Sequence, residues 1–237
     1  PGVRLVSHVV VRGPAKIGAG TQVWPFATIG CPPQDYKFGA DSVTARVVIG
    51  EACIIREQAS VHAATKADRP TTIGNKVFLM ACTHVAHDAT IEDEVIFVNY
   101  AGVAGHAHIG RKATLSGQAA VHQFCRIGRL AFMSAGTAVS TDVPPFCGVI
   151  ERQRVGGINL VGMRRSGMDR GEVTAVREAF RKALRTSLPR AEMLGVLTEL
   201  GQQWPAVAEM AEFVRTAKRP ICPGRGKPPR LGVGAGA

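Results

Sequence analysis

The stretch from Ile73 to Gly110 reads IGNKVFLMACTHVAHDATIEDEVIFVNYAGVAGHAHIG, and a large apolar residue returns in it at every sixth position. The same period runs without a break as far as Val139. These positions hold only aliphatic residues, methionine or phenylalanine: Ile73, Leu79, Val85, Ile91, Phe97, Val103, Ile109, Leu115, Val121, Ile127, Met133 and Val139. A period of six fits neither an amphipathic helix, with its period of 3.6, nor a strand with one buried face, with its period of two.

A second position is restricted in the same run, four residues after each large one. It holds small or β-branched residues and one cysteine: Val77, Thr83, Ala89, Val95, Ala101, Ala107, Ala113, Ala119, Cys125, Ala131 and Thr137. Shorter runs of the same period precede it, at residues 5–29 and 49–61. The pattern predicts an all-β solenoid, a parallel β-helix of triangular section with three hexads in each coil. The large side chains fill its interior, and the small ones fit near the corners.

The hexad pattern also predicts the domain organisation. We expect the β-helix to cover residues 1–148, with external loops near 31–48 and 63–72, where the frame is broken. Apolar residues at helical spacing follow, which predicts a small α-helical subdomain over residues 149–217. Residues 218–237 are basic and rich in proline and glycine, so we expect a disordered tail.

The cysteines bear on both chemistry and compartment. All six are scattered without paired spacing, so we expect them to be reduced and the protein to be cytoplasmic. Cys53 and Cys125 fall at the small position of their hexads and are predicted to be packing residues rather than nucleophiles. No apolar run approaches the roughly 18 residues that span a membrane, and no signal segment opens the chain.

The formal net charge is +11, which favours an acidic partner or a phosphorylated ligand. Aromatic residues make up only 5% of the chain and do not alternate with the basic ones, so nucleic acid is not expected as a partner.

Three histidines, His87, His106 and His122, are spaced by roughly one coil. On a β-helix this spacing predicts a row along one outer edge of three successive coils. Such a row suits two chemistries. One is a zinc ion bound by imidazoles, although ligands on coils about 4.8 Å apart would have to converge or be shared between subunits. The other is general base catalysis by His87, with Asp88 fixing its tautomer.

Six motifs then carry a resemblance to a known family. In chain order they are PPQDYKF, HVAHD, AGHAHIG, AAVHQFCRIG, DVPPF and GINLVGMRRSG. In this order and spacing they resemble the UDP-N-acetylglucosamine O-acyltransferases, which open lipid A biosynthesis in Gram-negative bacteria, over about residues 3–215. The resemblance implies a cytoplasmic homotrimer of left-handed β-helices with helical C-terminal subdomains and active sites between subunits. It also implies transfer of a 3-hydroxyacyl group from acyl carrier protein to the sugar 3-hydroxyl.

The same resemblance implies roles for individual residues. His87 is the general base, Asp88 orients it, and the backbone N–H of Gly105 meets the oxyanion of the thioester carbonyl. Further residues are implied in substrate binding: Gln34, Asp35, His84, His106, His122, Gln123, Asn159 and Arg165. The implied donor is the acyl-phosphopantetheine arm of acyl carrier protein, and the acceptor is a UDP-sugar. No metal and no bound cofactor is implied.

The chain departs from the family pattern at the nucleotide-facing end. Val161 stands where the family has an acidic residue, and Ser166 replaces a basic one. The chain also enters the repeat several hexads late, so we expect the family's first coils to be missing from it. Three alternatives therefore stay open: a related acyltransferase with a different nucleotide-sugar or amino-sugar acceptor, a zinc enzyme of the gamma carbonic anhydrase kind, and a scaffold without catalysis.

Overall fold

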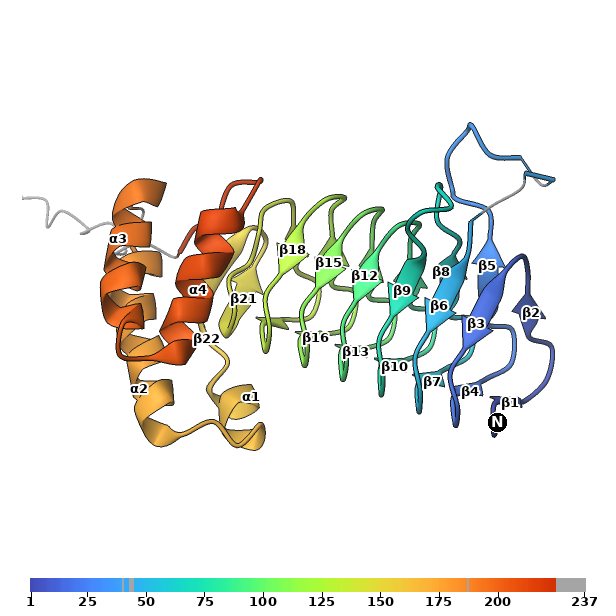
Figure 1. Ribbon diagram of the computed structural model, residues 1–237, viewed down its shortest axis with the longest axis horizontal. Helices are drawn as coiled ribbons and strands as arrows, with labels where there is room; N and C mark the ends of the chain where they lie inside the picture. Colours follow the sequence, from blue (N-terminus) through green and yellow to red (C-terminus); the bar gives the residue numbers. More distant parts are fainter. Residues whose placement is uncertain (40, 43–44, 187, 225–237) are drawn as a thin grey trace, which may run out of the picture.

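The computed structural model describes residues 1–39, 41–42, 45–186 and 188–224. Its strands stack into an elongated prism with three parallel sheets as its walls, and helices lie at the C-terminal end (Figure 1). Sheet A contains β1 (Arg4–Leu5), β4 (Gln22–Val23), β7 (Ile54–Ile55), β10 (Phe78–Leu79), β13 (Ile96–Phe97), β16 (Thr114–Leu115), β19 (Phe132–Met133), β21 (Cys147–Glu151) and β22 (Arg154–Ile158). Sheet B contains β2 (Val10–Val11), β5 (Thr28–Cys31), β8 (Ser60–His62), β11 (His84–Val85), β14 (Gly102–Val103), β17 (Ala120–Val121) and β20 (Ala138–Val139). Sheet C contains β3 (Ala15–Ile17), β6 (Val47–Ile49), β9 (Thr71–Ile73), β12 (Thr90–Ile91), β15 (His108–Ile109) and β18 (Arg126–Ile127).

The register of the sheets follows the hexads. From β10 onward in sheet A, parallel partners up to β19 lie eighteen residues apart, as in the pairing of Leu79 with Phe97. All twelve large residues of the run from Ile73 to Val139 are buried, with at most 2% of their surface exposed. The residues at the small position are buried as well. The prediction of a parallel β-helix built from hexads is therefore confirmed.

Cys53 and Cys125 are buried in the prism, and burial raises the pKa of both thiols, that of Cys125 to about 11. Both side chains therefore stay protonated at neutral pH, as packing residues would.

Leu5 and Val11 differ from the later hexads because they are about half exposed. Within the described residues, the strands that hold them, β1 and β2, each pair with a single strand, β4 and β5 of the following coil.

The corners of the prism use an uncommon backbone conformation. At the corner between sheets B and C, the residue directly before the small position has a positive φ and is not glycine: φ is 58° at Asp88, 60° at His106 and 62° at Phe124. Such residues cost free energy in isolation. Hydrogen bonds between coils compensate, such as the one from the His106 N–H to the His87 carbonyl at 3.1 Å. The corner between sheets B and C thus holds these side chains in fixed positions.

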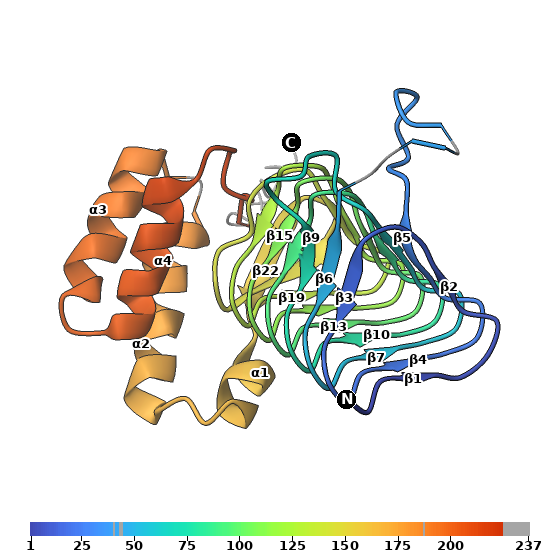
Figure 2. The ribbon, with the colours of Figure 1, turned by 45° about the vertical axis from the view of Figure 1, so that its right-hand side comes forward.

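Two segments project from the prism at this corner. The chain leaves the prism after β5, at residues 32–39, and returns to it at residues 45–46, before β6 (Figures 1 and 2). Residues 63–70 lie between β8 and β9, and the Ala45 N–H donates to the Ala64 carbonyl at 3.3 Å. The two segments therefore touch where they leave the prism.

The C-terminal part closes the end of the prism. Its helices are α1 (Leu160–Arg165), α2 (Arg170–Ala179), the π-helix η1 (Phe180–Leu184), α3 (Arg190–Gly201) and α4 (Pro205–Thr216). The structure differs from the expectation of helix from residue 149, because β21 and β22 form an antiparallel hairpin there. Val149 pairs with Met133 and is fully buried, so the hairpin continues sheet A past the last hexad.

Residues 218–224 belong to the segment for which the composition predicts disorder. The Cys222 N–H donates to the Asp142 carbonyl at 2.7 Å, and the Asp142 N–H donates to the Pro220 carbonyl at 2.9 Å. Cys222 is buried, so residues 218–224 pack against the last coil, and the expectation of disorder there is wrong. Proline and glycine are compatible with this extended strap, which composition alone does not distinguish from disorder. Residues 225–237 lie outside the described residues. None of the helices described is long and apolar enough to cross a membrane.

Candidate active site

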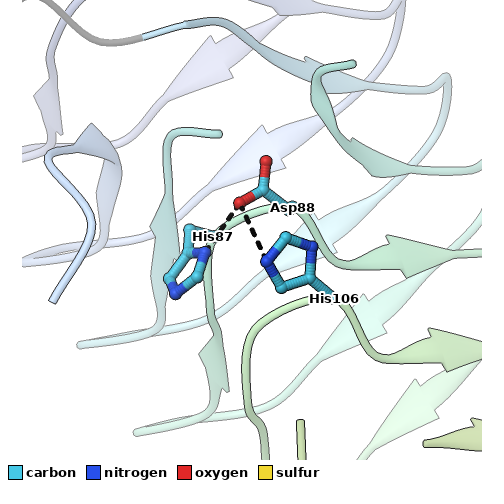
Figure 3. A group of neighbouring side chains, drawn as sticks. All are labelled: His87, Asp88 and His106. Carbon is cyan, nitrogen blue, oxygen red and sulfur yellow. Dashed lines mark hydrogen bonds and ion pairs between the residues drawn. The ribbon is translucent and has the colours of Figure 1, made fainter. Parts of the chain in front are cut away.

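His87, Asp88 and His106 meet at the corner between sheets B and C (Figure 3). His87 Nδ1 lies 2.7 Å from Asp88 Oδ2, and His106 Nε2 lies 3.6 Å from the same oxygen. The two imidazole rings are nearly perpendicular, with centroids 5.3 Å apart. One carboxylate thus lies between two rings, and the shorter contact makes His87 and Asp88 a hydrogen-bonded dyad.

The loop after β8 holds the Asp88 carboxylate in place. The Thr65 N–H donates to Oδ1 at 3.0 Å, and the Thr65 hydroxyl donates to Oδ2 at 2.9 Å. Burial opposes ionisation of Asp88, but hydrogen bonds from His87 and Thr65 outweigh it and lower the pKa of the carboxyl below its ordinary value. Asp88 is therefore an anion at neutral pH, directed at His87 Nδ1. Sequence reasoning missed Thr65, because a broken frame separates it from the dyad.

Gly105 lies directly against the ring of His87. A Cβ atom at this residue would stand 2.5 Å from His87 Cε1 and 2.7 Å from Nε2. Gly105 follows His87 by one coil, so the two residues occupy the same column of the corner. Within the described part of the chain, the Gly105 N–H donates to no backbone or side-chain acceptor. The open nitrogen of His87 and a free amide donor therefore lie next to each other.

The expected vertical row of three histidines is wrong. One coil after His87 the same column holds Gly105, and one coil further it holds Gln123, because the pairing advances by eighteen residues. His106 lies in the neighbouring column, below Asp88, and stacks on Phe124 with a centroid distance of 4.5 Å. His122 precedes Gln123, is exposed, and its ring bonds to the Gln123 carbonyl at 3.4 Å. Neither sequence spacing equals eighteen, so the rings fall into three adjacent columns.

Two more histidines lie behind the dyad. His84 Nδ1 is 2.8 Å from the Ser60 hydroxyl, and its ring meets that of His62 edge-on at 5.1 Å. Burial, followed by the charges of His62 and His87, lowers the pKa of His84 from 6.5 to about 4. Burial likewise lowers the pKa of His62. Both rings are therefore neutral at neutral pH, and they add no positive charge that would oppose proton uptake by His87.

Gln34 and Asp35 lie on the projecting segment that follows β5. Gln34 is exposed and Asp35 is half-buried. Asp35 Oδ1 accepts the Lys37 N–H at 3.1 Å, and its carbonyl accepts the Phe38 N–H at 2.9 Å, which makes a tight turn. Within the described residues, neither side chain is hydrogen-bonded to the dyad.

Asn159 and Arg165 lie on a different side of the prism. Asn159 caps α1, because its Oδ1 accepts the Gly162 N–H at 2.9 Å, and its Nδ2 donates to the Leu130 carbonyl at 2.8 Å. Both residues line a hollow of about 830 Å³ over sheet A, whose walls include Ile96 and Phe132. Sheet A forms the side of the triangle opposite the corner between sheets B and C. A single chain therefore does not bring these residues to His87.

The donor set at the corner bears on the zinc alternative. One atom from each of His87, Asp88 and His106 lies within 4.8 Å of the others, a set that includes the ligand types of zinc. Two ligands of one tetrahedral zinc ion stand about 3.3 Å apart, given bonds of about 2.0–2.1 Å. The 2.7 Å contact between His87 and Asp88 is instead a hydrogen bond, and Thr65 takes up further lone pairs of the carboxylate. The arrangement fits a proton-transfer dyad better than a zinc site.

The depressed pKa of His84 predicts a pH-dependent stability. The unfolded chain binds a proton at this ring below about pH 6.5 and the folded protein only below about pH 4, so the free energy of unfolding falls as pH is lowered through this window. We expect His84→Gln to remove about 2 kcal/mol of that fall. Urea unfolding at about pH 7.5 and about pH 4.5 measures it. His8→Gln, at an exposed ring, serves as control, and an equal fall in wild type and H84Q would contradict the prediction.

Comparisons with known proteins give matches over most of the chain. A family model described as "Udp N-acetylglucosamine O-acyltransferase; Domain 2" matches residues 142–222. The acyl-[acyl-carrier-protein]--UDP-N-acetylglucosamine O-acyltransferase of Thermodesulfovibrio yellowstonii is 37% identical over 93% of this chain and 86% of its own length. The enzyme of the same name from Azorhizobium caulinodans is 48% identical over 95% of this chain and 84% of its own.

Solved structures show the same likeness in three dimensions. The UDP-N-acetylglucosamine acyltransferase of Bacteroides fragilis superposes with a TM-score of 0.85 at 30% identity, over 93% of this chain and 86% of that one. The acyltransferase of Arabidopsis superposes with a TM-score of 0.82 at 31% identity, over 93% of this chain and 88% of that one. Since identity well above 30% extends over almost the whole chain, this protein belongs to the family of UDP-N-acetylglucosamine O-acyltransferases.

Proposed function

We propose that His87 is the general base with which this chain transfers a 3-hydroxyacyl group to the 3-hydroxyl of UDP-N-acetylglucosamine. As a member of its family, the chain moves an acyl group from acyl carrier protein to this sugar nucleotide, the first step of lipid A biosynthesis. The observation that carries the proposal is the dyad of His87 and ionised Asp88, with Nε2, to which the described residues supply no hydrogen bond, beside Gly105.

The proposed mechanism uses three groups of the corner. His87 Nε2 removes the proton of the sugar hydroxyl as its oxygen attacks the thioester carbon, while Asp88 stabilises the imidazolium that forms. The carbonyl oxygen becomes an oxyanion and accepts the N–H of Gly105. When the carbon–sulfur bond breaks, the imidazolium returns its proton to the leaving thiolate. The two substrates supply every atom and proton of this reaction, and its steps involve neither an acyl-enzyme nor a metal.

The remaining residues are assigned to substrate binding. Those at the dyad's corner and on the projecting segment face the acceptor sugar: Gln34, Asp35, His84, His106, His122 and Gln123. Asn159 and Arg165 serve the donor and the nucleotide. The apolar hollow beside them suits an acyl chain, because its walls include Ile96 and Phe132. At its rim Val161 is 58% exposed, and the Ser166 hydroxyl donates to the Met163 carbonyl at 2.7 Å. The nucleotide therefore depends on Arg165 and its neighbour Arg164.

The charge around the dyad suits acyl carrier protein. A second hollow, of about 920 Å³, lies over sheet C and is lined by Asp88 and His106. Five basic side chains also line it: Lys66, Arg69, Arg126, Lys218 and Arg219. We assign this hollow to the approach of the acidic donor and its phosphopantetheine arm, since complementary charge speeds encounter. The free cysteines are consistent with a reaction in the cytoplasm.

The separation of the site residues favours a homotrimer. His87 lies at one corner, while Asn159 and Arg165 lie over the opposite sheet, so one chain does not bring them together. In a cyclic trimer, one prism's corner faces the sheet A side of its neighbour, and each site takes residues from two subunits. The assembly thereby completes a site that one chain holds in two halves.

Replacing the base is the most direct test of the proposal. We expect His87→Ala to lower kcat about 10²–10⁴-fold, the usual contribution of a general base. Acyl transfer from 3-hydroxyacyl carrier protein to UDP-N-acetylglucosamine is followed by mass detection of the product. His8→Ala serves as control, because His8 is an exposed ring that stacks on Phe26 in the first coil. If H87A and H8A were equally active, the assignment of His87 would fail.

Gly105→Ala tests the position of the His87 ring. The added Cβ would stand within 2.7 Å of two ring atoms, so the imidazole must shift while the backbone keeps its conformation. We expect kcat to fall about 10²-fold, because displacement by 1 Å is enough for such a loss, with the melting temperature nearly unchanged. Gly117→Ala is the matched control, since its Cβ would meet the Asn99 carbonyl at an ordinary 3.5 Å. Full activity of G105A would contradict the proposed geometry.

Complementation between inactive variants tests the shared site. We expect His87→Ala and Arg165→Ala each to be nearly inactive alone. When they are coexpressed in equal amounts, about one quarter of the sites combine an intact His87 from one subunit with an intact Arg165 from the next. Activity of the purified mixed trimers should therefore rise to about a quarter of the wild-type value per site. A mixture no more active than its two components would show that both residues act within one chain.

A further inference from the structure

His62 is a buried imidazole that the proposed mechanism does not use. It ends β8, is 8% exposed, and its Nδ1 lies 2.6 Å from the Pro32 carbonyl oxygen. A carbonyl oxygen only accepts, so Nδ1 carries the proton and donates it. This bond fixes the tautomer of His62 without reference to any substrate.

Pro32 is the first residue of the projecting segment that follows β5. The backbone holds both ends of this segment to the same short stretch, because the Ala63 N–H donates to the Cys31 carbonyl at 2.9 Å and the Ala45 N–H donates to the Ala64 carbonyl. His62 adds a side-chain bond to this junction, at the point where the chain turns away from the prism. Gln34 and Asp35 follow Pro32 by two and three residues.

The His62 ring also contacts His84, which lies on the neighbouring coil. Its edge meets the His84 ring, and the charge of His87 adds to the effect of burial in lowering the pKa of both rings. His62 therefore contacts the root of the segment through Pro32 and His84 through its ring, and both rings lie close enough to His87 for its charge to affect them. Both rings are neutral, so the link consists of the hydrogen bond to Pro32 and the contact between the two rings.

We propose that His62 is a positioning residue for the acceptor sugar. Its bond to the Pro32 carbonyl fixes the direction in which the chain leaves β5, and so sets where Gln34 and Asp35 stand relative to His87. The inference rests on the proposed function, since the acceptor must meet both the segment and the base. His62 itself acts through the segment and does not touch the reacting atoms.

Two substitutions separate the bond from the bulk of the ring. His62→Leu keeps an apolar side chain of similar size and leaves the buried carbonyl without a donor. His62→Asn places an N–H near the position of Nδ1. We expect H62L to raise KM for UDP-N-acetylglucosamine about tenfold, which corresponds to about 1.4 kcal/mol, with kcat and the KM for the acyl carrier protein substrate within about twofold of wild type. In H62N the KM for UDP-N-acetylglucosamine should stay close to the wild-type value.

Amide hydrogen exchange gives a readout that is independent of activity. We expect the amides of residues 34–39 to exchange faster in H62L than in wild type, while H62N and the control His8→Leu resemble wild type. Asp35→Ala added to H62L should raise KM for the sugar nucleotide little further, because both changes remove the same contact. The melting temperature of each variant shows that the prism remains folded.

The outcomes distinguish the two proposals. An inactive wild-type enzyme would overturn the proposed function, and the exchange of residues 34–39 would still decide whether His62 anchors the segment. An active wild type with an unchanged KM in H62L would overturn this inference alone. So would a loss confined to kcat, or amide protection in H62L equal to that of wild type.

Discussion

The structure depends on the stacking of one large apolar side chain upon another inside a narrow prism. Each hexad sends one such residue inward, and three hexads must close a coil so that the next residue lands on the one before it. Burial of this column is non-directional, but the backbone hydrogen bonds between coils fix its register. The consequence for function is that, in the unbroken run from Ile73 to Val139, side chains eighteen residues apart share a column on the surface.

The site follows from this register. Because Gly105 occupies the column of His87, the imidazole can lie close against a backbone that carries no side chain. Because His106 is displaced by one residue, its ring lies in the column of Asp88 and reaches the same carboxylate from the other side. Two neighbouring columns thus place a base, its acid and a free amide donor within one corner. The rest of the substrate must be held by the segments that interrupt the repeat and, under the proposed assembly, by a second subunit.

The sequence alone predicts the parts that obey the period. The interior residues from Ile73 to Val139 were predicted individually, and so was the pairing of His87 with Asp88, since adjacent residues at a corner need no tertiary information. The row of three histidines failed because approximate spacing does not resolve columns one residue apart. Thr65 and His62 border a segment that leaves the frame, so no periodicity relates them to the dyad. The strap at residues 218–224 depends on contacts with the last coil, which composition does not reveal.

The central claim is that His87 Nε2 receives the proton of the sugar hydroxyl beside the Gly105 amide. The most direct measurement is a crystal structure of the protein with its product, UDP-3-O-(3-hydroxyacyl)-N-acetylglucosamine, bound. The account predicts the ester oxygen on the sugar within about 3.2 Å of His87 Nε2 and the ester carbonyl oxygen within about 3.1 Å of the Gly105 nitrogen. A product whose ester lies away from this corner, with His87 Nε2 facing only solvent, would contradict it.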